Sequence, residues 1–131
     1  MTKTEVRTDK SYRTAGPYVQ GIVAAASGRT VYTSGVLGRD TSGQLVDKSD
    51  VGAQSRQCLE NIRQIIEAAG GTLQDLVKLT VFVSHPKHYE AMNVVRKEVL
   101  AGIAFTSTAV VAQMIDPHGL VEMEAVAVIG G

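Results

Sequence analysis

Residues 51–69 carry apolar side chains at intervals of three and four, the spacing that places side chains on one face of an α-helix. Ser49 or Asp50 can cap the start of this helix, and Gly70-Gly71 ends it. A helix with one apolar face must bury that face on another apolar layer, so the pattern predicts a sheet beside it. The apolar positions are Val51, Cys58, Leu59, Ile62, Ile65, Ile66 and Ala69.

Period-two patterns elsewhere in the chain predict the strands of that sheet. Residues 18–26 and 30–34, separated by Ser27-Gly28-Arg29, predict a β-hairpin. Residues 77–83 alternate between apolar and mostly polar side chains, which predicts a third strand with one buried face. Two Val- and Ala-rich segments, 106–115 and 120–129, predict two more strands around the turn Asp116-Pro117-His118-Gly119.

A second helix is predicted between the third strand and the last two. Pro86 can open it, and the helix ends near Gly102. The order of elements favours one mixed sheet with both helices on a single face. The apolar residues on one side of this second helix are Tyr89, Met92, Val95 and Val99.

The last predicted strand has apolar residues on both of its faces. Val121, Met123, Ala125, Ala127 and Ile129 point one way, while Val126 and Val128 point the other way with Glu122 and Glu124. The helices can cover only one face. The apolar residues on the second face therefore predict that this face is buried against another subunit.

Composition excludes several classes of protein. The 131 residues predict one domain spanning 1–131, and 13 basic against 13 acidic side chains provide no general attraction to nucleic acid. Cys58 is the only cysteine, so no internal disulfide can form. Residues 1–5 lack the apolar stretch of a secretory signal, and no apolar run has the roughly 20 residues that cross a bilayer. We therefore expect a cytoplasmic protein.

Three other kinds of site are weighed and set aside. His85, His88, Asp116 and His118 do not have the spacing of a helical metal-ligand pair, so no metal site is expected. Cys58 belongs to the apolar stripe of the first helix, which favours a buried thiol over a nucleophile. Residues 35–38 are glycine-rich but lack the Lys-Ser/Thr that follows in a phosphate-binding loop.

Six segments, in this order along the chain, resemble the Rid (YjgF) family, a group of small trimeric proteins that includes enamine and imine deaminases. They cover nearly the whole chain, and the order makes the resemblance specific. The segments are Gly16-Pro17-Tyr18-Val19-Gln20-Gly21, Tyr32-Thr33-Ser34-Gly35, residues 54–62, residues 78–83, Met92-Asn93 and residues 121–128.

The resemblance implies a chorismate-mutase-like α+β fold with a mixed six-stranded sheet and two helices on one face. It also implies a homotrimer, in which the sheets form a central barrel and each subunit interface holds a pocket. The implied activity is hydrolysis of enamines and imines such as 2-aminoacrylate to a 2-keto acid and ammonia. The family's deaminases need no cofactor and no metal, and the partner is a small-molecule substrate rather than a membrane or nucleic acid.

By resemblance, Glu124 is the catalytic residue that orients a water molecule and carries a proton to the leaving nitrogen. Tyr18 would close the pocket from a neighbouring subunit, Ser34 and the Gly35 N–H would contact the substrate, and Asn93 would steady the loop or the ligand. Each of these residues also has a structural interpretation: an exposed or lysine-paired carboxylate, a turn anchor, a strand-end bulge and a surface helix residue.

Thr108 departs from the family pattern. The family's established deaminases have an arginine there, three residues after an aromatic, which binds the substrate carboxylate; Phe105 is present here but the arginine is not. Val110 likewise replaces a common cysteine. A hydroxyl donates one neutral hydrogen bond where a guanidinium donates a charged pair, so a non-standard substrate is expected. Arg39 or Lys87 could supply the cation from a loop, although solvated charges are the simpler interpretation.

These observations leave three functions open. The first is a deaminase for an imine or enamine whose binding does not depend on that arginine. The second is a non-catalytic trimer that binds a small metabolite. The third, an endoribonuclease, fits less well with zero net charge and only four Tyr and two Phe to stack on bases.

Overall fold

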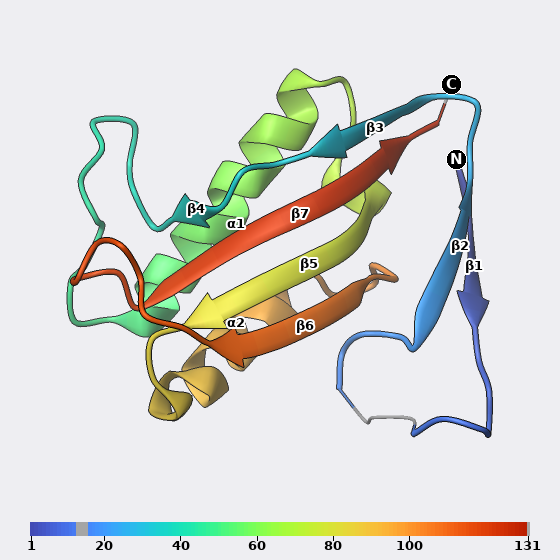
Figure 1. The fold of residues 1–131 in the computed structure, drawn as a ribbon. Helices are drawn as coiled ribbons and strands as arrows, with labels where there is room; N and C mark the ends of the chain where they lie inside the picture. The colour runs from blue at the N-terminus through green and yellow to red at the C-terminus, as the bar shows by residue number, and fades with distance from the viewer. Residues whose placement is uncertain (13–15, 131) are drawn as a thin grey trace.

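The computed structural model describes residues 1–12 and 16–130. Within them, two α-helices, α1 (Val51–Ala68) and α2 (Tyr89–Val99), cover one face of a sheet (Figure 1). The sheet has the strand order β3 (Arg29–Tyr32), β7 (Val121–Ile129), β5 (Leu76–Val83) and β6 (Thr106–Val111), and β4 (Val36–Leu37) also pairs with β7. The predicted α+β class is confirmed.

The sheet is mixed because β5 and β6 are parallel while β7 runs antiparallel to β3, β4 and β5. A parallel pair needs a long crossover, and α2 lies in the crossover from β5 to β6. The predicted mixed sheet with both helices on one face is therefore confirmed, and none of the helices and strands of the described residues covers the opposite face in Figure 1.

The core lies between the sheet and the helices. On β7 the five predicted inward residues, from Val121 to Ile129 at every second position, are all buried. From α1, Cys58, Leu59, Ile62 and Ile66 are buried against them, whereas Ile65 is exposed at the edge of the stripe. The apolar patterns of α1 and β7 thus meet as the sequence predicts.

The predicted hairpin is wrong, and with it the six-stranded sheet. β2 (Gly21–Ala25) pairs with β1 (Thr2–Val6) in a separate two-stranded sheet, and β3 pairs with β7, which leaves five strands in the main sheet of the described chain. Gly28 lacks the positive φ that tight hairpin turns require, and the chain turns a corner there instead of folding back (Figure 1).

The two-stranded sheet is attached to the edge of the main sheet by polar contacts. The Lys3 ammonium donates to the carbonyl oxygens of Leu76, at 2.6 Å, and Ala104, at 3.0 Å. The Val19 N–H donates to the Phe105 carbonyl at 3.0 Å. These bonds place the segment that carries Tyr18 beside the start of β6.

Three boundaries differ from the sequence prediction. Residues Pro86–His88 form a 3₁₀ turn, so α2 begins at Tyr89. The pairing register of β5 with β7 shifts between Leu76 and Lys78, so Leu76 rather than Val77 takes the buried position. β6 ends at Val111, opposite the last residue of its partner β5, and Ile115 beyond it is fully exposed.

The ends of α1 are defined by its flanking residues. The Asp50 carboxylate accepts a hydrogen bond from the Ala53 N–H at 3.0 Å, which confirms one of the two predicted caps. The helix stops at Gly70, whose φ of +97° suits glycine. No helix in the described part of the chain has the length and apolar character needed to cross a bilayer.

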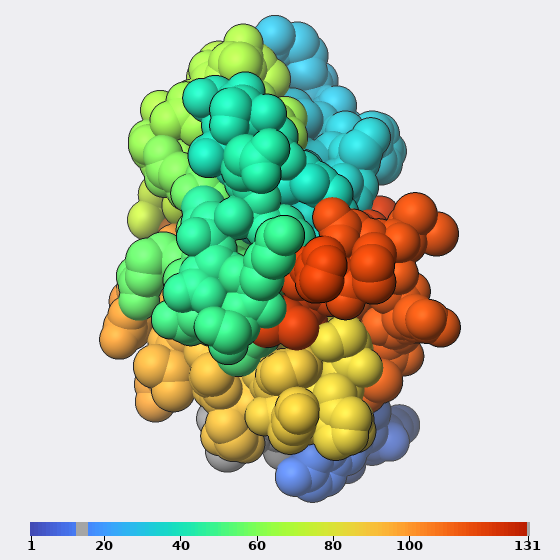
Figure 2. All heavy atoms as spheres, turned by 90° about the vertical axis from the view of Figure 1, so that its left-hand side faces the viewer, coloured from blue at the N-terminus to red at the C-terminus, as the bar shows by residue number. Residues whose placement is uncertain are grey.

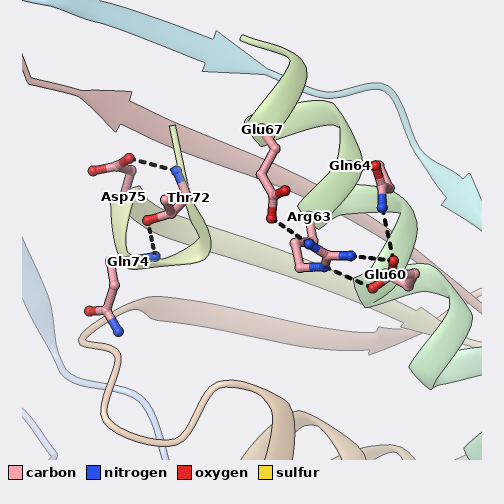
Figure 3. A network of polar contacts seen from close by, with 7 residues as sticks. All are labelled: Glu60, Arg63, Gln64, Glu67, Thr72, Gln74 and Asp75. Atoms are coloured by element: carbon pink, nitrogen blue, oxygen red, sulfur yellow. Dashed lines mark hydrogen bonds and ion pairs between the residues drawn. The ribbon is translucent and has the colours of Figure 1, made fainter. Parts of the chain in front are cut away.

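Two separate groups of polar contacts lie on the last turns of α1 and in the turn before β5 (Figure 3). Arg63 pairs with Glu60 and Glu67, and its hydrogen bonds lower the pKa of Glu60 to about 2. Thr72 and Asp75 cap the following turn through the Gln74 and Thr72 N–H groups. Because these side chains are largely exposed, the contacts shape the surface and contribute little to stability.

Candidate functional site

The open face of the sheet brings together residues that are far apart in the sequence. Glu124 on β7 lies opposite Thr80 on β5, and Thr80 lies opposite Thr108 on β6. Neighbouring strands are about 4.8 Å apart, so Glu124 and Thr108 lie in one row, about 10 Å from each other. Val110 shares this face, in the next row beside Phe82.

Glu124 stands at a shallow hollow of about 200 Å³ on this face. Its side chain is exposed and, among the described residues, it forms no ion pair or hydrogen bond. Lys78 and Thr80 bring an ammonium group and a hydroxyl to the same hollow. The Glu124 carboxylate therefore shares this hollow with two side chains that can donate hydrogen bonds. The lining residues are Tyr32, Thr33, Lys78, Thr80, Glu124, Ala125 and Val126.

Ser34 and Gly35 lie in the connection between β3 and β4. Thr33 ties this connection to β7, because its N–H donates to the Ala125 carbonyl at 2.9 Å and its hydroxyl accepts from the Ala125 N–H at 3.0 Å. Ser34 is exposed next to Thr33. A side chain at Gly35 would meet the end of the Glu122 side chain, so Glu122 would have to shift to accommodate it.

Tyr18 and Asn93 gather around a buried arginine that sequence reasoning missed. Arg96 on α2 is fully buried, and its guanidinium donates to Asn93 Oδ1 at 2.9 Å. The Tyr18 ring lies over it, with 5.1 Å from Cζ to the ring centroid. The sequence held a signal, because Arg96 follows Met92 by four residues and so falls on the apolar side of α2.

Tyr18 and Thr108 also line one groove of about 430 Å³ at the β6 edge. Lys78 lines both this groove and the hollow at Glu124, so the two recesses adjoin on the open face. Within the single chain, the Tyr18 ring lies against Arg96, and its predicted role at a subunit interface stays a prediction. The structure therefore groups Glu124, Thr108 and Tyr18 along one surface, while Ser34, Gly35 and Asn93 line neither recess.

Neither loop cation considered in place of the missing arginine lines these recesses. Arg39 is held elsewhere, because its guanidinium pairs with Asp116 at 2.7 Å and donates to the Gly43 carbonyl at 2.9 Å. Figure 2 shows the turquoise and green loop that contains Arg39 lying beside the red turn around Asp116. Lys87 is exposed on the turn before α2.

The histidines and the cysteine have structural positions. His85 Nδ1 accepts a hydrogen bond from the Lys87 N–H at 3.0 Å, and the His85 and His88 ring centroids are 6.4 Å apart. In the described residues, no group of three or more His, Cys, Asp or Glu side chains could hold a metal ion. Cys58 lies in the core, and its thiol contacts the Val36 carbonyl at 3.4 Å.

Burial raises the pKa of the Cys58 thiol to about 12, so the thiolate is scarce at neutral pH. We expect a thiol reagent such as dithionitrobenzoate to label the native protein at pH 8 only as fast as the chain unfolds. Labelling in urea should be immediate and should provide the control. Rapid labelling of the native protein would mean that Cys58 is reachable and that the packing of α1 on β7 is looser than described.

The sequence model of the Endoribonuclease L-PSP family matches residues 8–129. A RutC family protein of Pyrococcus abyssi is 32% identical over 127 residues, which are 97% of this chain and 98% of that protein. This chain belongs to the Rid (YjgF) family. The open sheet face and its two recesses are therefore features of a Rid-family chain.

Two solved structures extend this comparison. RidA from the Antarctic bacterium Psychrobacter is 33% identical, with a TM-score of 0.71 and coverage of 96% of this chain and 99% of that one. Escherichia coli TdcF, whose crystal structure contains bound serine, is 29% identical, with a TM-score of 0.72 and coverage of 97% and 99%. This protein thus shares its fold with Rid proteins over nearly its whole length.

Proposed function

We propose that this protein hydrolyses an imine or enamine metabolite to a carbonyl compound and ammonia, with Glu124 as the proton carrier. The observation that carries the proposal is the position of Glu124: an unpaired carboxylate at a hollow on the open sheet face, in one row with Thr108. Family membership supports the same chemistry.

The reaction requires the protein to position the substrate and a water molecule and to transfer protons. An imine carbon is already electrophilic, so a water molecule adds to it once Glu124 accepts one of the water's protons. Glu124 returns that proton to the nitrogen, which gives a neutral carbinolamine. Glu124 then takes the carbinolamine's hydroxyl proton and delivers it to the nitrogen, so that the C–N bond breaks, ammonia leaves and a C=O bond replaces C=N. An enamine first takes a proton on carbon to become the imine. The hydroxyls of Thr80 and Thr108 would orient the substrate beside the carboxylate.

The site is completed in this proposal by a homotrimer that covers the open face. Apolar side chains on this face are exposed or only half-buried in the single chain, which a soluble monomer seldom leaves uncovered. Each hollow would then lie at a subunit interface, where exclusion of water strengthens its polar contacts. The apolar residues are Tyr32, Phe82, Val110, Val126 and Val128.

Light scattering at micromolar concentration is expected to give three times the chain mass. Val126→Asp should dissociate the assembly, because it places charges at the centre of the covered face. Val94→Asp is the matched control, since Val94 is 55% exposed on α2, on the helix side of the sheet, and should leave the trimer intact. A monomeric wild-type protein would refute both the trimer and an interfacial site.

A metabolite-binding trimer without catalysis is the second candidate, and the serine bound to the homologous TdcF favours it as a small amino-acid-like ligand site. Release of ammonia and keto acid from a panel of amino-acid-derived imines separates the two functions. Turnover of any imine supports the enzyme, whereas binding without turnover across the panel supports the binder. Incubation with single-stranded RNA in parallel tests the activity in the family's name.

A further inference from the structure

Arg96 is a buried cation without an anionic partner. Its side chain has no exposed surface, and no Asp or Glu of the described residues forms an ion pair with it. Its hydrogen bonds go to neutral acceptors: Ser107 Oγ at 2.9 Å, Asn93 Oδ1 at 2.9 Å and the Tyr89 hydroxyl at 3.1 Å. Its Nε–H is buried and has no acceptor within residues 1–12 and 16–130.

A charge in this position costs free energy unless something compensates for the loss of water. Buried ions in proteins are paired or bound to a ligand, because desolvation of a guanidinium far exceeds what neutral hydrogen bonds return. The rings of Tyr18 and Tyr89, at 5.1 and 5.7 Å, supply part of the compensation through their π faces. The Nε–H is the part of the guanidinium that these contacts leave without an acceptor among the described residues.

The guanidinium lies one side chain away from bulk solvent. Tyr18 covers it and is itself only half-buried, and its hydroxyl forms no hydrogen bond with another described residue. Tyr18 is also a shared wall of two recesses, the groove with Thr108 and an apolar pocket of about 380 Å³ lined by Val83, Tyr89 and Val111. A rotation of the Tyr18 ring would therefore open Arg96 to both recesses.

We propose that Arg96 is the anion-binding group of this protein and that it holds the carboxylate of a small monocarboxylic metabolite beneath Tyr18. A planar carboxylate matches the fork of guanidinium N–H groups and would take the open Nε–H. The adjoining apolar pocket favours a ligand with an apolar side chain. That the ligand is an imine or keto acid rests on the proposed function. The binding site itself is inferred from the burial and the contacts of Arg96 alone.

Calorimetric titration with 2-oxobutanoate, a stable keto acid, tests the site in the absence of turnover. We expect wild-type protein to bind this probe at millimolar concentrations and to bind butanone, which lacks the carboxylate, far more weakly. Arg96→Met, which keeps the side-chain volume, should lower the affinity for 2-oxobutanoate about 10- to 100-fold, the worth of a charged hydrogen-bonding pair. Arg56→Met is the matched control, because it removes an exposed arginine that pairs with Glu98.

Asn93→Asp keeps the assay decisive if Arg96→Met does not fold. The new carboxylate would stand 2.9 Å from the guanidinium and neutralise it from within the chain. We expect this variant to have a higher melting temperature than wild type and to lose 2-oxobutanoate binding to a similar extent. Unchanged affinity in Asn93→Asp or Arg96→Met overturns the proposal, and so does a wild-type protein that does not bind the probe.

Two further outcomes separate this site from the proposed reaction. If 2-oxobutanoate binding depends on Arg96 but no imine is hydrolysed, the anion site stands and the deaminase function fails. If imines are hydrolysed and Arg96→Met leaves KM for carboxylate-bearing imines unchanged, the deaminase stands and the anion site fails. If Arg96→Met instead dissociates the trimer and wild type does not bind the probe, the counter-ion is a partner subunit's carboxylate and the proposal is overturned.

Discussion

Glu124→Gln is expected to lower kcat for imine hydrolysis by about 10²- to 10⁴-fold while the oligomeric state and the melting temperature stay unchanged. Glutamine keeps the shape and the hydrogen-bonding reach of glutamate but can neither accept a proton from water nor deliver one to nitrogen. Because Glu124 is exposed and has no hydrogen bond or ion pair with any described residue, its replacement breaks no contact of the fold. The measurement is ammonia release from the best imine of the panel, with circular dichroism and light scattering as checks.

Glu122→Gln is the matched control for this variant. Glu122 is on the same strand and the same face, one row away beside Phe82, so the two substitutions change the same chemistry at positions two residues apart. We expect Glu122→Gln to keep most of the turnover. If Glu122→Gln loses activity and Glu124→Gln does not, the proton carrier is misassigned by one row of the sheet. Full activity in both variants would mean that neither carboxylate takes part.

An arginine at position 108 should rescue the loss caused by Arg96→Met. Thr108 adjoins Ser107, the residue that accepts a hydrogen bond from Arg96, and it lies on the open face in one row with Glu124. In the Arg96→Met background, Thr108→Arg can supply a new guanidinium to the groove that Tyr18 and Thr108 line. We expect kcat/KM for a carboxylate-bearing imine to fall about 10- to 100-fold in Arg96→Met and to recover by a similar factor in the double variant.

Two comparisons define this experiment. Thr108→Gln in the same background gives length and hydrogen-bonding capacity without charge, and it should rescue little. An imine that lacks a carboxylate should respond to none of these changes, since an arginine without an anion gains no partner. If Thr108→Arg raises the kcat/KM of the wild-type background 10- to 100-fold and Arg96→Met has no effect, the carboxylate binds at position 108 and Arg96 serves only the fold.

Much of the fold is predictable because its main elements carry local patterns. The helical spacing in 51–69 and the alternation in 121–129 each identify both an element and its buried face, and the Asp50 cap confirms where α1 begins. The hairpin prediction fails for a different reason. The residues of β2 and β3 suit strands in any sheet, and their partners are chosen by turn geometry at Gly28 and by the apolar residues available on β7.

The candidate site, like the fold, could be predicted from the sequence only in part. The resemblance directs attention to Glu124 and Thr108, and the pairing of β7, β5 and β6 puts them in one row. Arg96 escapes sequence reasoning because an arginine on a short helix is usually a solvated surface charge. Its burial depends on Tyr18, Asn93 and Ser107, which come from three separate parts of the chain.

The sequence by itself determined the helices, the inward face of β7 and the membership of this protein in the Rid family, because these follow from local periodicity and from the order of short segments. Only the tertiary structure decided which strands pair and which charge is left without a partner. Pairing and burial depend on residues distant in the chain: Arg96 becomes a buried cation only when α2, β6 and the Tyr18 segment meet.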